Sequence, residues 1–118
     1  MKTEVILEKN RLNELKFFVK QFNIWMEARS SIQKNLDTSK TSVKAQIERY
    51  TKKINLVLDT IHRACLDNEK YEDVVLYCVV NSVSFTEYCR YVYSDDLDKE
   101  TYIKCLTMFW TLLNEVKE

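Results

Sequence analysis

The residues best suited to chemistry form an acidic cluster: Asp95, Asp96, Asp98 and Glu100 lie within six consecutive positions. The D-x-D spacing of Asp96 and Asp98 is one that can contribute ligands to a divalent cation. A metal site needs further ligands, and neither a histidine nor a second acidic cluster accompanies these residues at metal-ligand spacing. Carboxylates in such a position also cap helices and face solvent. The cluster therefore predicts a helix cap and a solvated turn, with no bound metal or other cofactor.

The cysteines and the single histidine are the other candidates for chemistry. Cys65, Cys78, Cys89 and Cys105 are separated by 13, 11 and 16 positions, so no pair has the C-x-x-C spacing of zinc or redox sites. Thiols without such spacing commonly pack as small apolar groups in proteins of reducing compartments. His62 lies in the middle of a helical segment, where histidine is more often a packed or surface residue than a general base. The sequence predicts no disulfide and no enzymatic activity.

Composition limits the fold classes that the chain can adopt. The 118 residues include no glycine and no proline, whereas average usage is about 7% glycine and about 5% proline. Phosphate-cradling loops and two-residue hairpins depend on glycine or on another residue at positive φ. The sequence therefore excludes glycine-rich nucleotide-binding loops and predicts one all-α domain over residues 1–118.

Neither a membrane span nor a secretion signal is expected. No apolar run approaches the roughly 20 residues that cross a bilayer. The first ten residues, MKTEVILEKN, lack the hydrophobic stretch of a signal peptide. The sequence predicts a cytoplasmic protein that does not bind membranes.

Charge is distributed unevenly along the chain, although the net charge is zero. Residues 1–66 contain thirteen Lys and Arg against seven Asp and Glu, a net charge of +6. Residues 67–118 contain five against eleven, a net charge of −6. Such asymmetry bears on partners and association rather than on fold.

A long amphipathic helix is predicted over residues 3–36, followed by a second over residues 42–66. The apolar stripe of the first recurs in steps of three and four residues and includes Leu15, Phe18, Phe22 and Trp25. One interpretation is an antiparallel hairpin over residues 3–66 that buries its own stripes. The other is a homodimer sealed by the four stripe residues, which we favour because the first helix would be about 50 Å long.

Three shorter helices are predicted over residues 67–118. Asp67 and Asn68 are suited to cap a helix over residues 69–80. Asn81 tolerates the left-handed conformation and would end that helix. The following two helices are marked by their own caps.

The SFTE sequence of residues 84–87 has the pattern of a capping box and predicts a helix up to residue 93. Asp98, or Ser94 one turn earlier, would cap the last helix. A short helix, a polar turn and a capped helix have the outline of a helix-turn-helix. The expected architecture is a long helical hairpin followed by a three-helix, helix-turn-helix-like unit.

From Tyr50 onward the order of residues resembles the phage late-transcription regulators of the ArpU and RinA type. The matching stretches are YTKKI at residues 50–54, VVLYCVVNSVSFTEY at residues 74–88 and DKETYIKCLTMFWTLL at residues 98–113. The last stretch places Lys104 at the basic position of the family pattern, and Leu106, Trp110 and Leu113 at its apolar positions. The resemblance implies a unit similar to the sigma-factor region that reads the −35 promoter element, with the last helix in the major groove.

The charge of the last helix favours a protein partner over DNA. Where the family pattern presents basic and amide side chains, this helix begins with the acidic cluster, and only Lys99 and Lys104 on it could face phosphate. We therefore expect a small transcription-regulatory protein of phage or mobile-element type that modifies or antagonises a basic activator or polymerase subunit. The expected protein-binding residues are Asp95, Asp96, Glu100, Tyr91 and Tyr93.

Three alternatives remain open at the level of sequence. The first is direct DNA binding, with phosphate contacts from Lys99, Lys104, Arg90, Lys52 and Lys53. The second is an inhibitor of a host nucleic-acid enzyme whose acidic face imitates the charge of DNA. The third is an assembly module that uses the first helix as a coiled coil.

Overall fold

The structure, a computed structural model, describes residues 8–92 and 96–117, and the regular secondary structure there is entirely helical. The elements are α1 (Lys9–Lys20), α2 (Phe22–Asn35), α3 (Thr41–Ala64), the 3₁₀ segment η1 (Glu69–Tyr71), α4 (Glu72–Asn81), α5 (Phe85–Val92) and α6 (Lys99–Val116). The all-α prediction is confirmed. Within the described ranges, no helix is long and apolar enough to cross a membrane.

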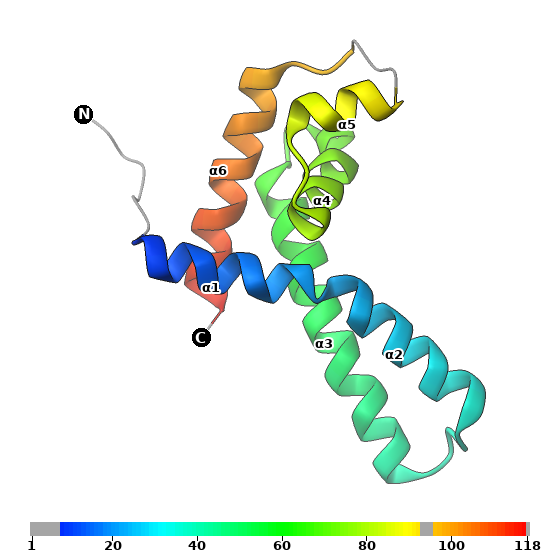
Figure 1. Cartoon of the computed structure of the whole chain (residues 1–118). Helices are drawn as coiled ribbons and strands as arrows, with labels where there is room; N and C mark the ends of the chain where they lie inside the picture. The colour runs from blue at the N-terminus through cyan, green and yellow to red at the C-terminus, as the bar shows by residue number, and fades with distance from the viewer. Residues whose placement is uncertain (1–7, 93–95, 118) are drawn as a thin grey trace.

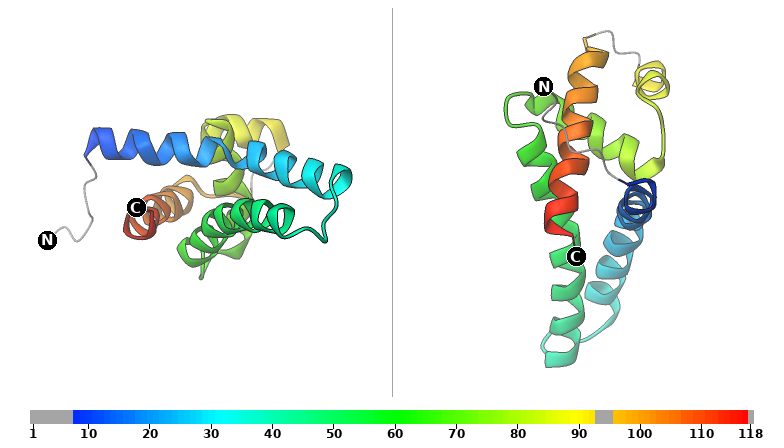
Figure 2. Two further views of the ribbon diagram at one scale, coloured as in Figure 1. Left: turned by 90° about the horizontal axis from the view of Figure 1, so that it is seen from below. Right: turned by 90° about the vertical axis from the view of Figure 1, so that its left-hand side faces the viewer.

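The helices form two layers. α3 and α6 lie side by side and run in opposite directions, and α1, α2, α4 and α5 cover one side of them (Figures 1 and 2). α2 packs along the first half of α3, and the two form a hairpin that extends away from the other helices (Figure 1). This hairpin makes the molecule elongated, with dimensions of 52 × 34 × 25 Å.

The single helix predicted over residues 3–36 is two helices in the described part, and this correction changes the architecture. Gln21 separates α1 from α2: its N–H donates to the Phe18 carbonyl (3.2 Å), and its side-chain amide donates to the Phe17 carbonyl (3.3 Å). The break lets α2 follow α3 while α1 lies against α4 and α6. Arg11 then fastens α1 to the end of α6 through Nε, which donates to Asn114 Oδ1 at 2.7 Å.

The apolar stripe of the first segment is buried in the chain's own core. Leu15, Phe22 and Trp25 are at most 6% exposed, and the ring of Phe18 lies 4.9 Å from that of Trp25. The stripe packs with the buried faces of α3, α4 and α6 in one hydrophobic cluster. This burial removes the reason for assigning a dimer interface to these four residues. Self-association of the chain stays a prediction.

The helix caps agree with the sequence in two places. Ser84 and Glu87 form the expected capping box, in which the Glu87 N–H donates to Ser84 Oγ at 3.1 Å and the Ser84 hydroxyl donates to Glu87 Oε1 at 3.1 Å. The Asp98 carboxylate accepts from the N–H of Thr101 at 3.0 Å and so caps α6. Both helix starts are therefore fixed by local hydrogen bonds.

Two expected features of α4 are wrong in detail. The left-handed residue after α4 is Ser82 (φ 55°, ψ 45°), and Asn81 remains helical, with its amide donating to the Tyr77 carbonyl at 2.9 Å. At the other end, the side chain of Asn68 makes no capping bond, and its carbonyl accepts from the Tyr71 N–H at 2.9 Å. Because this hydrogen bond joins residues three positions apart, the first turn is a 3₁₀ helix, and α4 begins at Glu72.

Candidate functional site

The start of α6 is held by two residues of η1. The hydroxyl of Tyr71 accepts from the N–H of Asp98 at 2.6 Å, and Lys70 Nζ donates to the carbonyl of Asp96 at 3.2 Å. The Asp98 carboxylate is occupied by its cap, which accepts from both the N–H and the hydroxyl of Thr101. These bonds hold residues 96–98 against η1 at the start of α6.

Of the predicted acidic residues, Asp96 and Glu100 remain available to a partner. Both are exposed, and neither forms an ion pair within residues 8–92 and 96–117. Asp98 has a different role, because hydrogen bonds from the Thr101 N–H and hydroxyl lower the pKa of its carboxyl below the ordinary value. Asp95 lies outside the described residues. The acidic start of α6 is thus one capping carboxylate flanked by two exposed ones.

The expected aromatic patch lies on α4 and α5. Tyr91 is 74% exposed, and its ring stacks on that of Tyr77 with centroids 6.4 Å apart. Tyr77 also contacts Tyr88, at 5.5 Å between centroids. These three tyrosines form a cluster that does not include the start of α6, and Tyr93 lies outside the described residues. The contacts that the structure gives Tyr91 are thus with the tyrosine cluster of α4 and α5.

The basic residues of the DNA-binding alternative divide into two groups. Arg90, Lys99 and Lys104 are exposed on α5 and on the first turns of α6. Lys52 and Lys53 lie at the opposite end of α6, where they line a hollow together with Val116. Lys104 precedes Val116 by twelve residues of α6, so the two groups are at least about 18 Å apart along the helix. They do not form one basic patch.

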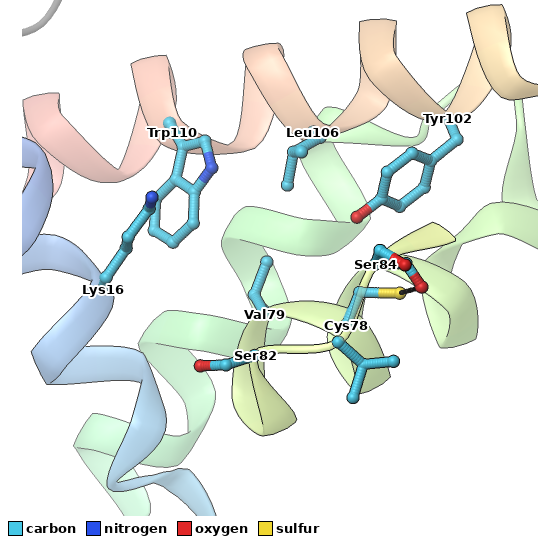
Figure 3. A pocket seen from close by; sticks show the side chains of 9 residues that line it. Lys16, Cys78, Val79, Ser82, Ser84, Tyr102, Leu106 and Trp110 are labelled. Carbon is cyan, nitrogen blue, oxygen red and sulfur yellow. Dashed lines mark hydrogen bonds between the residues drawn. The ribbon is translucent and has the colours of Figure 1, made fainter. Parts of the chain in front are cut away.

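A cavity of about 330 Å³ lies between α1, the α4–α5 turn and α6 (Figure 3). Its lining residues are Lys16, Cys78, Val79, Ser82, Val83, Ser84, Tyr102, Leu106 and Trp110. Cys78 Sγ donates to the Ser84 carbonyl at 3.9 Å (Figure 3). Burial is the main cause that raises the pKa of both the Cys78 thiol and the Tyr102 hydroxyl. Neither group is activated as a nucleophile or base at neutral pH.

This cavity could not be predicted from the sequence, because its walls come from three separate segments. Lys16 precedes the nearest other lining residue by more than sixty positions, and no linear spacing could connect them. Ser82, whose φ is positive, lines the cavity at the turn between α4 and α5.

His62 and the cysteines take part in contacts between helices or in the core. His62 Nδ1 lies 3.1 Å from Glu72 Oε2 and joins α3 to α4 on an exposed surface. Cys65, Cys78 and Cys105 are buried in the core, as predicted, and Cys89 is half-buried; all four are free thiols. Burial raises the pKa of Cys65 to about 12, with the neighbouring Cys105 contributing. In the described part of the chain, no three His, Cys, Asp or Glu side chains gather as metal ligands.

The chain was compared with known protein families, with curated protein sequences and with solved structures, and none of them matches.

Proposed function

We propose that this chain is a non-catalytic regulatory protein that binds a basic protein partner through the acidic start of α6. The observation that carries the proposal is a pair of exposed carboxylates that form no ion pair within the described residues: Asp96 just before α6 and Glu100 in its first turn. The backbone between them is held by Tyr71 and by the Asp98 cap. A backbone that is already held loses little conformational freedom on binding, and exposed carboxylates attract Lys and Arg of a partner over several ångströms.

The resemblance to phage late-transcription regulators suggests what the partner is. A relative of those proteins with an acidic last helix would bind a transcription activator or a polymerase subunit in place of DNA. We therefore propose a cytoplasmic role in transcription regulation, of phage or mobile-element type. Direct DNA binding is the less favoured alternative, since its candidate cations lie at opposite ends of α6.

Charge reversal tests the proposal. The double variant Asp96→Lys/Glu100→Lys should lose a partner captured from nuclease-treated extract of a phage-carrying Gram-positive host. Glu115→Lys, at the other end of α6, is the matched control and should retain it. Identification of the partner as a basic transcription protein supports the proposal. Binding of a specific DNA duplex by the unmodified chain at nanomolar concentration and physiological salt would show that the proposal is wrong.

A further inference from the structure

The junction between α3 and α6 carries apolar side chains that the core leaves exposed. Leu66, directly after α3, is 60% exposed, and Met108 and Val116 of α6 are 47% and 38% exposed. Leu112 lies between the latter two along α6 and is half-buried. Gathered apolar surface of this kind marks sites where another molecule binds. We name this surface the α3–α6 seam, defined by Leu56, Ala64, Leu66, Met108, Leu112 and Val116.

Two hollows lie along the seam. The first, of about 320 Å³, is lined by Ala64, Leu66, Met108 and Leu112 among others. The second, of about 340 Å³, is lined by Leu56 and Val116 and, on its inner side, by Phe18 of α1. Ala64 follows Leu56 by eight residues of α3, so the hollows are about 12 Å apart. An α-helix presents side chains at positions i and i+7 or i+8 at nearly this separation.

Apart from Phe18 of α1, no residue of α1, α2, α4 or α5 lines either hollow. Both views in Figure 2 place α1, α2, α4 and α5 together on one side of α3 and α6. A helix bound along the seam would therefore add a third layer without displacing an element. Grooves between two packed helices are a common way to bind an amphipathic helix.

Charge selects the kind of helix. Lys52 and Lys53 line the second hollow, and Arg63 lines the first. Lys52 and Arg63 are exposed, whereas Lys53 is half-buried with its Nζ 5.7 Å from the centroid of the Trp25 ring. Asp67 is the one carboxylate among the described residues that line the two hollows. Acidic side chains that flank the apolar anchors of a partner would meet these cations, which favours an acidic helix over a neutral or basic one.

A second copy of the chain fits the seam less well. α1 and α2 present an exposed apolar pair seven positions apart, Phe17 and Ile24. Lys16 and Lys20 are exposed beside that pair, so docking it on the seam would bring like charges together. Nucleic acid would meet the cations but would leave the apolar hollows unfilled.

We propose that the α3–α6 seam is the docking site for an acidic amphipathic helix of a protein partner. Two of the partner's apolar side chains, seven or eight positions apart, fill the two hollows, and its carboxylates face Lys52, Lys53 and Arg63. This site is independent of the acidic start of α6, and the Asp96→Lys/Glu100→Lys variant should bind the same helix unchanged.

The test uses a display library of 16-residue helical peptides. Each position of a peptide is randomised among Leu, Ala, Glu and Lys. Selection on the full chain should enrich peptides with net negative charge and leucines at i and i+7 or i+8. Met108→Asp and Lys52→Glu/Lys53→Glu should each weaken the binding of a selected peptide at least tenfold. The control is Ile103→Asp: Ile103 lies on the same helix, is also 47% exposed and lines neither hollow.

Several results would overturn the proposal. These are failure to select any peptide, enrichment of basic peptides, or equal loss of binding in Ile103→Asp and Met108→Asp. Self-association that Met108→Asp abolishes would assign the seam to a second copy of the chain. Binding of duplex DNA that Lys52→Glu/Lys53→Glu abolishes would assign it to nucleic acid. Circular dichroism of each variant separates lost binding from lost folding.

Discussion

At the scale of single residues, local hydrogen bonds and burial act on protonation in opposite directions. Asp98 accepts hydrogen bonds in its charged form, and its pKa is lowered. Tyr102 and Cys78 lie at the buried wall of the α1–α4–α6 cavity, and burial raises their pKa values. Folding therefore favours the ionised form of the Asp98 carboxyl at the start of α6. It favours the protonated forms of the Tyr102 phenol on α6 and of the Cys78 thiol on α4.

The cap of α6 should make stability depend on pH below the ordinary carboxyl range. Because folding lowers the pKa of Asp98 from 3.8, its contribution is present above that pH and is lost as pH falls through the folded-state pKa. Asp98→Asn keeps a capping oxygen without titrating. At pH 7 the unmodified chain should have a higher unfolding temperature than Asp98→Asn. The difference between the two unfolding temperatures should shrink towards pH 2. Asp59→Asn is the surface control, and a difference that does not change with pH would contradict the assignment.

The left-handed Ser82 should gain from replacement by glycine. A non-glycine residue in this conformation is less favourable by about 1–2 kcal/mol, and the greater freedom of glycine in the unfolded chain offsets part of this gain. Ser82→Gly should therefore raise the free energy of unfolding by about 0.5–1 kcal/mol. Ser82→Val should lower it, because a β-branched residue disfavours positive φ. Urea unfolding measures both, and a loss of stability in Ser82→Gly would refute the expectation.

At the scale of elements, the break at Gln21 decides where the first apolar stripe goes. α1, which carries the buried Leu15 and Val19, packs on α4 and α6, and α2, which carries Phe22 and Trp25, packs along α3. Phe22, next to the break, also lines a hollow with residues of α4. One continuous apolar stripe in the sequence thus packs against two different sets of helices. Its side chains hold the layers of a single chain together.

Truncation of the stripe should destabilise a single chain. Leu15 is fully buried, so Leu15→Ala should lower the free energy of unfolding by about 2–5 kcal/mol. Phe17→Ala, two positions away and 69% exposed, should change it by no more than about 0.5 kcal/mol. If the stripe serves one chain alone, the unfolding temperature of both variants should not depend on protein concentration. If the unfolding temperature of the unmodified chain depends on protein concentration and that of Leu15→Ala does not, the stripe would be a dimer interface after all.

The sequence was most informative where local chemistry decides the structure. The capping box at Ser84 and Glu87 and the cap at Asp98 involve neighbours three positions apart, and apolar spacing identified the buried face of the first segment. The break at Gln21 could not be predicted, since no glycine or proline marks it and distant contacts with α3, α4 and α6 determine it. The cavity and the seam join residues from separate helices, so they depend on tertiary packing that spacing does not encode.

At the scale of the whole molecule, the chain presents surfaces of opposite character at different places. Asp96 and Glu100 are exposed at the start of α6, whereas Lys52 and Lys53 flank its other end. The net charges of +6 and −6 in the two parts of the sequence underlie this separation. The two surfaces share no residue, so each can be changed by mutation without altering the other.

The protruding α2–α3 hairpin has a consequence for how the molecule opens. Val43, near the tip, is buried but does not belong to the main hydrophobic cluster, so few apolar contacts join the tip to the rest of the molecule. We expect amides near the start of α3 to exchange with deuterium by local opening, while those around Val57 and Ile61 exchange only on global unfolding. Hydrogen-exchange mass spectrometry should then show two protection levels along one helix. Uniform protection along α3 would mean that the hairpin and the body unfold as a single cooperative unit.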